Sequence, residues 1–220
     1  MQTIQLGFAA GKKELLKRAY VLALITIFYN IVEGLVSVFF GLEDETIALF
    51  GFGLDSFIEV VSGIGIWHMV RRMKTNLNVD PDRFEQLALK ITGASFYVLT
   101  AGLILTAAVN LYRDHRPETT FWGIVVSSVS IVTMWVLIRL KMSVGKQLGS
   151  QAILADAACT RTCLYLSFVL LAASAGYELT GIGWLDSAGA LLIAWFSFRE
   201  GREAFDKAKG KTCSCNRACA

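Results

Sequence analysis

The chain has 220 residues, of which 55% are hydrophobic and only 18% are charged. In soluble domains about a quarter of all residues are charged. This composition therefore excludes a single soluble core and indicates a polytopic membrane protein. The net charge of +3 is small, and no basic stripe with interleaved aromatic residues accompanies it, which excludes a nucleic-acid-binding protein.

Six apolar segments, taken in chain order, are long enough to cross a bilayer, which requires about 20 residues per helix. They cover residues 19–42, 46–70, 86–112, 121–140, 151–177 and 183–198. Their connections are short, so successive helices are expected to be antiparallel neighbours. The sequence therefore predicts an all-α membrane protein: a segment 1–18, a six-helix transmembrane bundle 19–204 and a short cysteine-containing tail 205–220.

The basic residues gather on one side of the predicted bundle. Of the 21 lysines and arginines, Arg113 and Arg116 lie on the opposite side, and Lys90 and Arg161 fall within spans. The others precede the first helix, follow the sixth, or lie in the second and fourth connections. Because basic connections stay in the cytoplasm, both termini are expected to be cytoplasmic, in a multi-pass protein of the inner or plasma membrane. Residues 1–13 do not resemble a cleavable signal peptide.

Ionisable side chains inside apolar spans are costly, and they usually mark a site, a pathway or an ion pair. Asp55 and Glu59 are four residues apart, which puts both carboxylates on one face of a helix, one turn apart. Two carboxylates so near each other repel unless one is protonated or a cation lies between them. The pair therefore predicts a divalent-cation site; the alternative is that each carboxylate pairs with Lys90 or Arg161.

Cys159 and Cys163 repeat the four-residue spacing in the fifth span. Taken alone, this spacing is weak evidence for a metal site, because a free cysteine often serves as a small buried hydrophobic residue. Combined with Asp55 and Glu59, the two thiols complete a set of four ligands on two helices, the number that a tetrahedral site requires.

Further motifs accompany these pairs in four of the six predicted helices. They are Asn30 and Gly34 in the first, Asp55 and Glu59 after Thr46-Ile47-Ala48-Leu49 in the second, Ser150 and Ala155-Asp156 in the fifth, and Leu185-Asp186 and Glu200-Gly201 in the sixth. In this pattern the chain, from about residue 30 to residue 205, resembles the transmembrane domain of the cation diffusion facilitator family.

The resemblance implies a homodimeric transporter that exports a divalent metal from the cytoplasm in exchange for protons. Family members bind the metal at mid-membrane through two ligands from the second helix and two from the fifth, here Asp55, Glu59, Cys159 and Cys163. The fifth-helix pair is usually His and Asp, and the family's metallochaperone-like domain after the sixth helix is not expected here. Thiolates favour softer metals, so Zn²⁺ or Cd²⁺ is the expected substrate. Thiols also release protons when they bind metal, so proton exchange remains compatible with cysteine ligands.

Other polar residues are secondary candidates. Asp156 is interpreted as a group that orients the metal ligands or lines the ion pathway, or alternatively as an ion-pair partner of Lys90. Glu33 and Asn30 are candidates for the access path. In the tail, Cys213, Cys215 and Cys219 either capture metal in the cytoplasm or have no role.

Two competing functions remain. A membrane metal sensor could use the same four ligands without transport. A membrane enzyme is not expected, because the sequence lacks a nucleophile–base pair and a nucleotide-binding loop. No organic cofactor is expected either; the predicted partners are the metal ion, protons, the lipid bilayer and a second copy of the chain.

Overall fold

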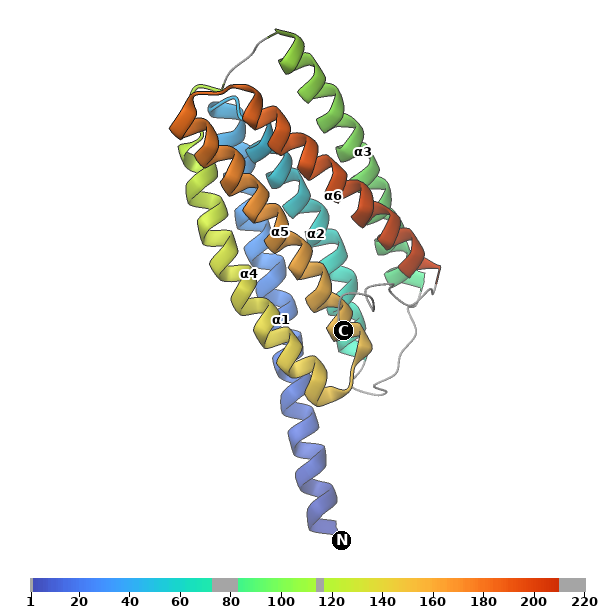
Figure 1. Cartoon of the computed structure of the whole chain (residues 1–220). Helices are drawn as coiled ribbons and strands as arrows, with labels where there is room; N and C mark the ends of the chain where they lie inside the picture. The colour runs from blue at the N-terminus through green and yellow to red at the C-terminus, as the bar shows by residue number, and fades with distance from the viewer. Residues whose placement is uncertain (1, 73–82, 114–116, 210–220) are drawn as a thin grey trace.

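The residues that the structure describes fold as a bundle of six α-helices (Figure 1). The computed structural model describes residues 2–72, 83–113 and 117–209. The helices are α1 (Gln2–Glu43), α2 (Ile47–Arg72), α3 (Arg83–Arg113), α4 (Phe121–Leu148), α5 (Gln151–Thr180) and α6 (Trp184–Ala208). The prediction of an all-α protein with six helices is confirmed. Helices α1, α4 and α6 extend beyond the predicted apolar segments, because charged side chains end an apolar run without interrupting the backbone hydrogen bonds of a helix.

Five of the six helices are long and apolar enough to cross a membrane, and α6 is the exception. Its mean hydropathy is lowered by the charged residues of its C-terminal half and by buried polar residues, among them Asp186, Ser187 and Ser197. On its other face, Leu192 and Trp195 are exposed. Helix α6 therefore turns a mixed face, in which Ser197 accompanies the apolar Ile193, to its neighbours and an apolar face outward, the arrangement that suits a helix in contact with lipid.

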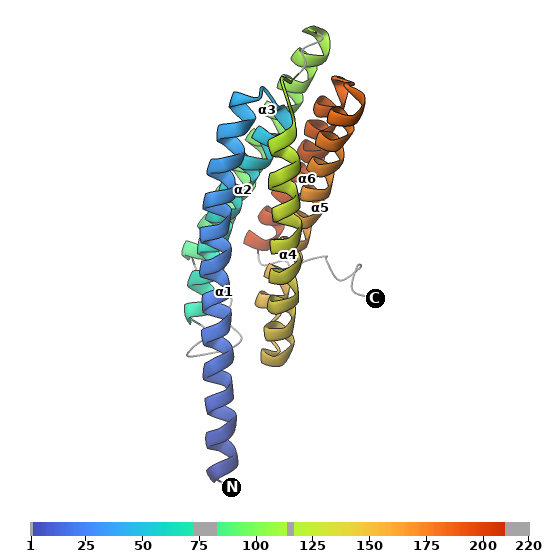
Figure 2. The same ribbon diagram turned by 90° about the vertical axis from the view of Figure 1, so that its left-hand side faces the viewer.

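The helices pack in three extensive pairs, α1 with α2, α4 with α5, and α3 with α6 (Figure 1). Seen from the side, α4 lies between α1 and α5 (Figure 2). Helix α2 contacts every other helix. At Gly53 of α2, a Cβ atom would lie 2.8 Å from the backbone nitrogen of Val38 in α1, so only glycine permits this approach. Helix α2 is therefore placed to present side chains to all its neighbours.

Asp186, from the Leu-Asp motif that opens α6, caps the beginning of α2. Its Oδ2 and Oδ1 atoms accept hydrogen bonds from the backbone N–H groups of Ile47 and Ala48 at 2.9 and 3.1 Å. A carboxylate is stabilising at this position, because the first N–H groups of a helix lack partners and carry partial positive charge. The contact ties the start of α6 to the start of α2.

Two apolar clusters form the core, one toward each end of the bundle. The first contains Leu16, Met69, Leu137, Val144 and Ile153, and the second contains Leu49, Phe52, Leu103, Leu166 and Ile193. Buried polar residues lie between them along the helices, including Asn30, Glu33 and Asp55. The bundle is therefore apolar at both ends of its core and polar in the middle.

Three tryptophan–arginine pairs lie along three of the helices. The guanidinium carbon lies 5.1 to 6.0 Å from the centroid of the indole ring in each pair: Arg71 with Trp67, Arg139 with Trp135, and Arg199 with Trp195. The pairs lie on α2, α4 and α6. Those on α2 and α4 lie in the C-terminal halves of their helices, and the pair on α6 lies near the middle of its helix, on either side of Ser197. Tryptophan and arginine are typical of the boundary between hydrocarbon and water.

Candidate metal site

Glu59 and Cys163, two of the predicted ligands, are in direct contact in the middle of the bundle. The Cys163 thiol donates a hydrogen bond to Oε1 of Glu59. On its other side, Oε2 of Glu59 accepts a hydrogen bond from Nδ2 of Asn30 at 3.0 Å. The Glu59 carboxylate is therefore held between α1 and α5, with an amide donor on one side and a thiol donor on the other.

Cys159 lies one helical turn before Cys163 and contacts a cation of the protein itself. Nζ of Lys207 donates to Sγ of Cys159 at 2.9 Å, and it also lies 3.9 Å from Oε2 of Glu203. The Lys207 side chain is only 16% exposed. A positive charge therefore already lies beside one of the two candidate thiol ligands.

These groups border one small cavity of about 50 Å³. Its polar lining includes Asn30, Glu59, Asp156, Cys159, Cys163, Glu200 and Lys207. On this measure a cavity needs roughly 10–15 Å³ to hold one water molecule, so the space can hold a cation together with water. Two candidate thiols and one candidate carboxylate thus share a single compartment.

Asp55, the fourth predicted ligand, points elsewhere. Its side chain is buried, and Oδ1 accepts a hydrogen bond from Oγ of Ser197 in α6 at 3.3 Å. It does not border the cavity. Among the residues that the structure describes, no three histidine, cysteine, aspartate or glutamate side chains are close enough together to hold one ion. The four candidate ligands are thus neighbours along two helices without forming a closed coordination sphere.

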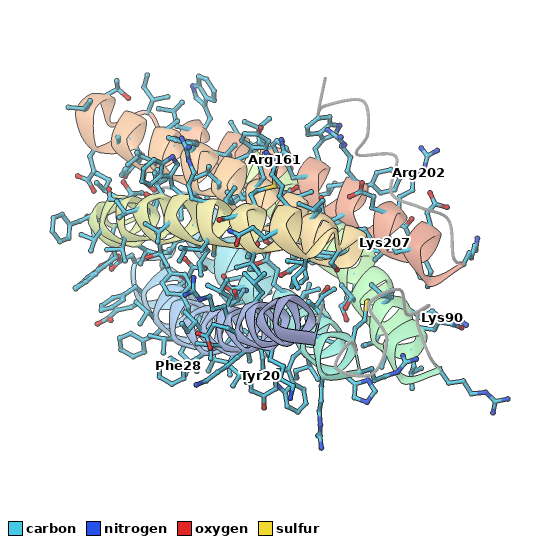
Figure 3. The ribbon with its side chains drawn as sticks, turned by 90° about the horizontal axis from the view of Figure 1, so that it is seen from below. Tyr20, Phe28, Lys90, Arg161, Arg202 and Lys207 are labelled. Carbon is cyan, nitrogen blue, oxygen red and sulfur yellow. The ribbon has the colours of Figure 1, made fainter. Side chains whose placement is uncertain are left out.

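The partner of Asp156 is Lys141, and the predicted alternative, an ion pair with Lys90, is wrong. Nζ of Lys141 lies 2.9 Å from Oδ2 of Asp156 and donates to Oγ1 of Thr160 at 2.9 Å. Lys90 is exposed on α3 at the periphery of the bundle (Figure 3). Hydropathy does not indicate Lys141 as a buried partner, because it follows the apolar run of the fourth segment. Helix α4 continues past that run and places Lys141 in the interior, where it is 1% exposed.

The two first-helix candidates occupy different surroundings. Asn30 is buried and borders the cavity, and its Oδ1 atom has no hydrogen-bond partner among the described residues. Glu33 is buried one turn further along α1, where it accepts hydrogen bonds from hydroxyl groups. Neither Asp55 nor Glu59 forms an ion pair with Lys90 or Arg161 in the described part of the chain.

Two cavity residues have a role that sequence reasoning did not assign. Lys207 was grouped with the basic residues after the sixth helix, and Glu200 was noted only as part of the Glu-Gly motif. Both border the cavity because α6 continues to Ala208, beyond its apolar run. The helical spacing from Glu200 to Lys207 is the signal that places them on one face. The tail cysteines Cys213, Cys215 and Cys219 lie outside the described residues.

The comparison with known families agrees with this architecture. The model of the cation efflux transmembrane domain matches residues 19–208, which is most of the chain and spans all six helices. No curated protein sequence matches the chain. The match, together with the apolar helices and the polar interior, leads to one conclusion: the chain belongs to the cation efflux family and is an integral membrane protein that transports metal cations.

Proposed function

We propose that the chain exports a soft or borderline divalent metal, zinc or cadmium, in exchange for protons, and that Asp55, Glu59, Cys159 and Cys163 bind the metal in transit. One observation carries the proposal: the Cys163 thiol donates a hydrogen bond to Glu59 inside the bundle. Thiols and carboxylates bind metal only after they lose their protons. A cation that replaces the proton of this hydrogen bond therefore binds both groups, and metal binding is coupled to proton release.

Two local movements complete the proposed four-ligand site. Asp55 turns away from Ser197, and the Lys207 ammonium leaves Cys159, whose thiolate the metal then binds. Both movements involve side chains and leave the helices in place. The orphan Oδ1 atom of Asn30 at the cavity wall supports a cation or its water at this position, because buried oxygens seldom remain without partners.

The ligand chemistry supports the choice of metal. Thiolates select soft and borderline ions, whereas sites for manganese or magnesium are built from carboxylates, carbonyls and water. Two thiols with two carboxylates suit zinc or cadmium at tetrahedral coordination. The proposed selectivity order places these two metals far ahead of manganese.

The proposed orientation puts both termini in the cytoplasm. The basic residues at the ends of the helices support it, because cytoplasmic connections carry the excess of basic residues. A homodimer in the cell membrane belongs to the same proposal, on the strength of the family resemblance.

Reconstitution into proteoliposomes tests the function. Zn²⁺, Cd²⁺ and Mn²⁺ are offered in turn while metal flux and internal pH are recorded together. We expect zinc or cadmium flux with opposing proton movement, and loss of both in Cys159→Ala/Cys163→Ala. Thr106→Ala/Ser128→Ala, which changes two exposed hydroxyls, is the matched control and keeps full flux. Metal flux without proton movement refutes the antiport, and tight binding without flux identifies a sensor.

A separate experiment addresses the tail. If Cys213, Cys215 and Cys219 capture metal for the bundle, deleting the residues after Lys211 slows metal uptake at low metal concentration and leaves the maximal rate unchanged. An unchanged rate at every concentration means that the tail has no role in transport.

A further inference from the structure

A threonine of α3 is buried beside the cavity of the candidate metal site, and its hydroxyl group has no hydrogen-bond partner. Thr92 is 2% exposed and borders the cavity, and its Oγ1 atom forms no hydrogen bond with the described residues. Five other helical threonines donate to the carbonyl oxygen four residues before them: Thr26, Thr100, Thr106, Thr160 and Thr180. The Thr92 hydroxyl does not use this partner on its own helix. Buried polar atoms seldom remain unpaired, so this one points to a ligand in the cavity.

A second unpartnered oxygen borders the same cavity from α1. The Nδ2 atom of Asn30 donates to Oε2 of Glu59 at 3.0 Å. A carboxylate oxygen only accepts hydrogen bonds, so the amide turns its nitrogen to Glu59. The Oδ1 atom that remains has no partner among the described residues, although Asn30 is only 1% exposed. Two helices thus bring two buried, unsatisfied acceptor oxygens to one cavity of about 50 Å³.

Two acceptor oxygens at one cavity match a molecule that donates two hydrogen bonds. A metal-bound water is such a donor, because its oxygen faces the cation and both of its hydrogens point away from the cation. Amide and hydroxyl oxygens suit hard cations as direct ligands, whereas the thiols at this cavity suit zinc or cadmium. These two oxygens therefore fit a water molecule on the cation better than the cation itself.

The described arrangement leaves an entering cation one ligand short. Glu59, Cys159 and Cys163 border the cavity. Asp55 does not, because its carboxylate contacts α6 instead. Once the Lys207 ammonium leaves Cys159, as proposed above, a tetrahedral ion finds three protein ligands and one open position. Zinc sites with three protein ligands carry water in the fourth position, so a water ligand completes the set.

We propose that Thr92 and Asn30 form a water-binding subsite, which holds the last water molecule of the entering cation as its fourth ligand until Asp55 replaces it. This inference rests on the proposed function and adds a loading state to it, in which three protein ligands and one water precede the four-ligand site. The cation then exchanges its last water for Asp55 without passing through a three-coordinate state. Thr92 is a positioning residue, because it acts on the cation only through the water.

The variant Asp55→Asn isolates the loading state, because it removes the replacing carboxylate and retains an acceptor oxygen for Ser197. In the full-length Asp55→Asn protein in detergent, we expect Thr92→Val to weaken Cd²⁺ binding about tenfold, the effect of one hydrogen bond to a charged group. Calorimetric titration measures the affinity. Thr92→Ser retains the hydroxyl and the affinity. Thr106→Val makes the same change at an exposed position of α3, and this matched control leaves the affinity unchanged.

Kinetics test the same subsite in a protein that keeps Asp55. The water is then absent from the final complex, so Thr92→Val leaves the equilibrium Kd for Cd²⁺ unchanged. Its association rate in stopped-flow measurements falls about tenfold, because the loading state on the way to that complex is destabilised. Thr92→Ser and Thr106→Val associate at the wild-type rate. This experiment decides the question even where Asp55→Asn does not fold.

Stability separates the subsite from a packing role. Thr92→Val removes an unsatisfied buried hydroxyl, so the metal-free variant is expected to be at least as stable as the wild type in chemical denaturation. A less stable variant identifies a packing role and overturns the subsite. An unchanged association rate in Thr92→Val, or an unchanged affinity in folded Asp55→Asn/Thr92→Val, also overturns it and leaves the four-ligand site standing. A wild-type protein that binds no Cd²⁺ overturns the proposed function and this inference together.

Discussion

The buried pair of Lys141 and Asp156 allows the sharpest stability prediction. The Lys141 side chain is 2% exposed, the Asp156 side chain is 16% exposed, and Nζ lies 2.9 Å from Oδ2. Lys141→Met keeps the length of the side chain and leaves Asp156 without its cation. Breaking a fully buried pair in this way costs about 3–5 kcal/mol. Asp156 borders the cavity and can be hydrated there, so we expect a loss of about 2–3 kcal/mol.

Reversible unfolding in mixed micelles measures this loss, with the fluorescence of the chain's five tryptophans as the probe. Lys146→Met, on an exposed lysine of the same helix, is the matched control and changes the free energy of unfolding by less than about 0.5 kcal/mol. Lys141→Met/Asp156→Asn removes the stranded charge and recovers most of the loss. A loss in Lys141→Met no larger than that of Lys146→Met refutes the reasoning that a buried ion pair holds α4 to α5.

Two further predictions concern Lys207 and Asp44. Because the Lys207 ammonium competes with a metal for Cys159, we expect Lys207→Met to tighten Cd²⁺ binding about tenfold. This factor corresponds to the free energy of one charge-assisted hydrogen bond. Calorimetric titration measures the affinity, and the control Lys209→Met keeps the wild-type value. Burial, with the nearby carboxylates of Glu43, Glu118 and Glu178, raises the pKa of Asp44 above its ordinary value. The contribution of Asp44 to stability is therefore full below about pH 4 and is lost as the pH rises through the raised pKa. We thus expect Asp44→Asn to raise the melting temperature at neutral pH and not in acid. Equal gains in melting temperature at both pH values contradict this.

Much of the architecture could be predicted from the sequence because hydropathy is a local property. Each run of about 20 apolar residues must satisfy its backbone within itself, which leaves the helix as the available structure. The same reasoning failed at the helix ends, where α4 and α6 continue into charged sequence. Hydropathy therefore predicts Lys141 and Lys207 to be loop or tail charges, whereas Lys141 is buried in the bundle and the Lys207 side chain is only 16% exposed.

The candidate metal site could be predicted from the sequence only in part. The four-residue spacings of Asp55 with Glu59 and of Cys159 with Cys163 determine by themselves which residues share a helix face. They do not determine what that face meets. The structure turns Asp55 toward Ser197, brings Glu59 against Cys163, and gives Cys159 a lysine neighbour. These choices depend on how α2, α5 and α6 approach one another.

The sequence by itself thus determined the helices, the polar residues among them and the pairing of ligands by spacing, all of which follow from periodicity along one chain segment. Only the tertiary structure decided the ion-pair partner of Asp156, the cavity, and the hydroxyl cluster around Glu33. The physical reason is that these features join residues from different helices. Their side chains meet because close packing at residues such as Gly53 sets the distance between helices, and no local pattern encodes that distance.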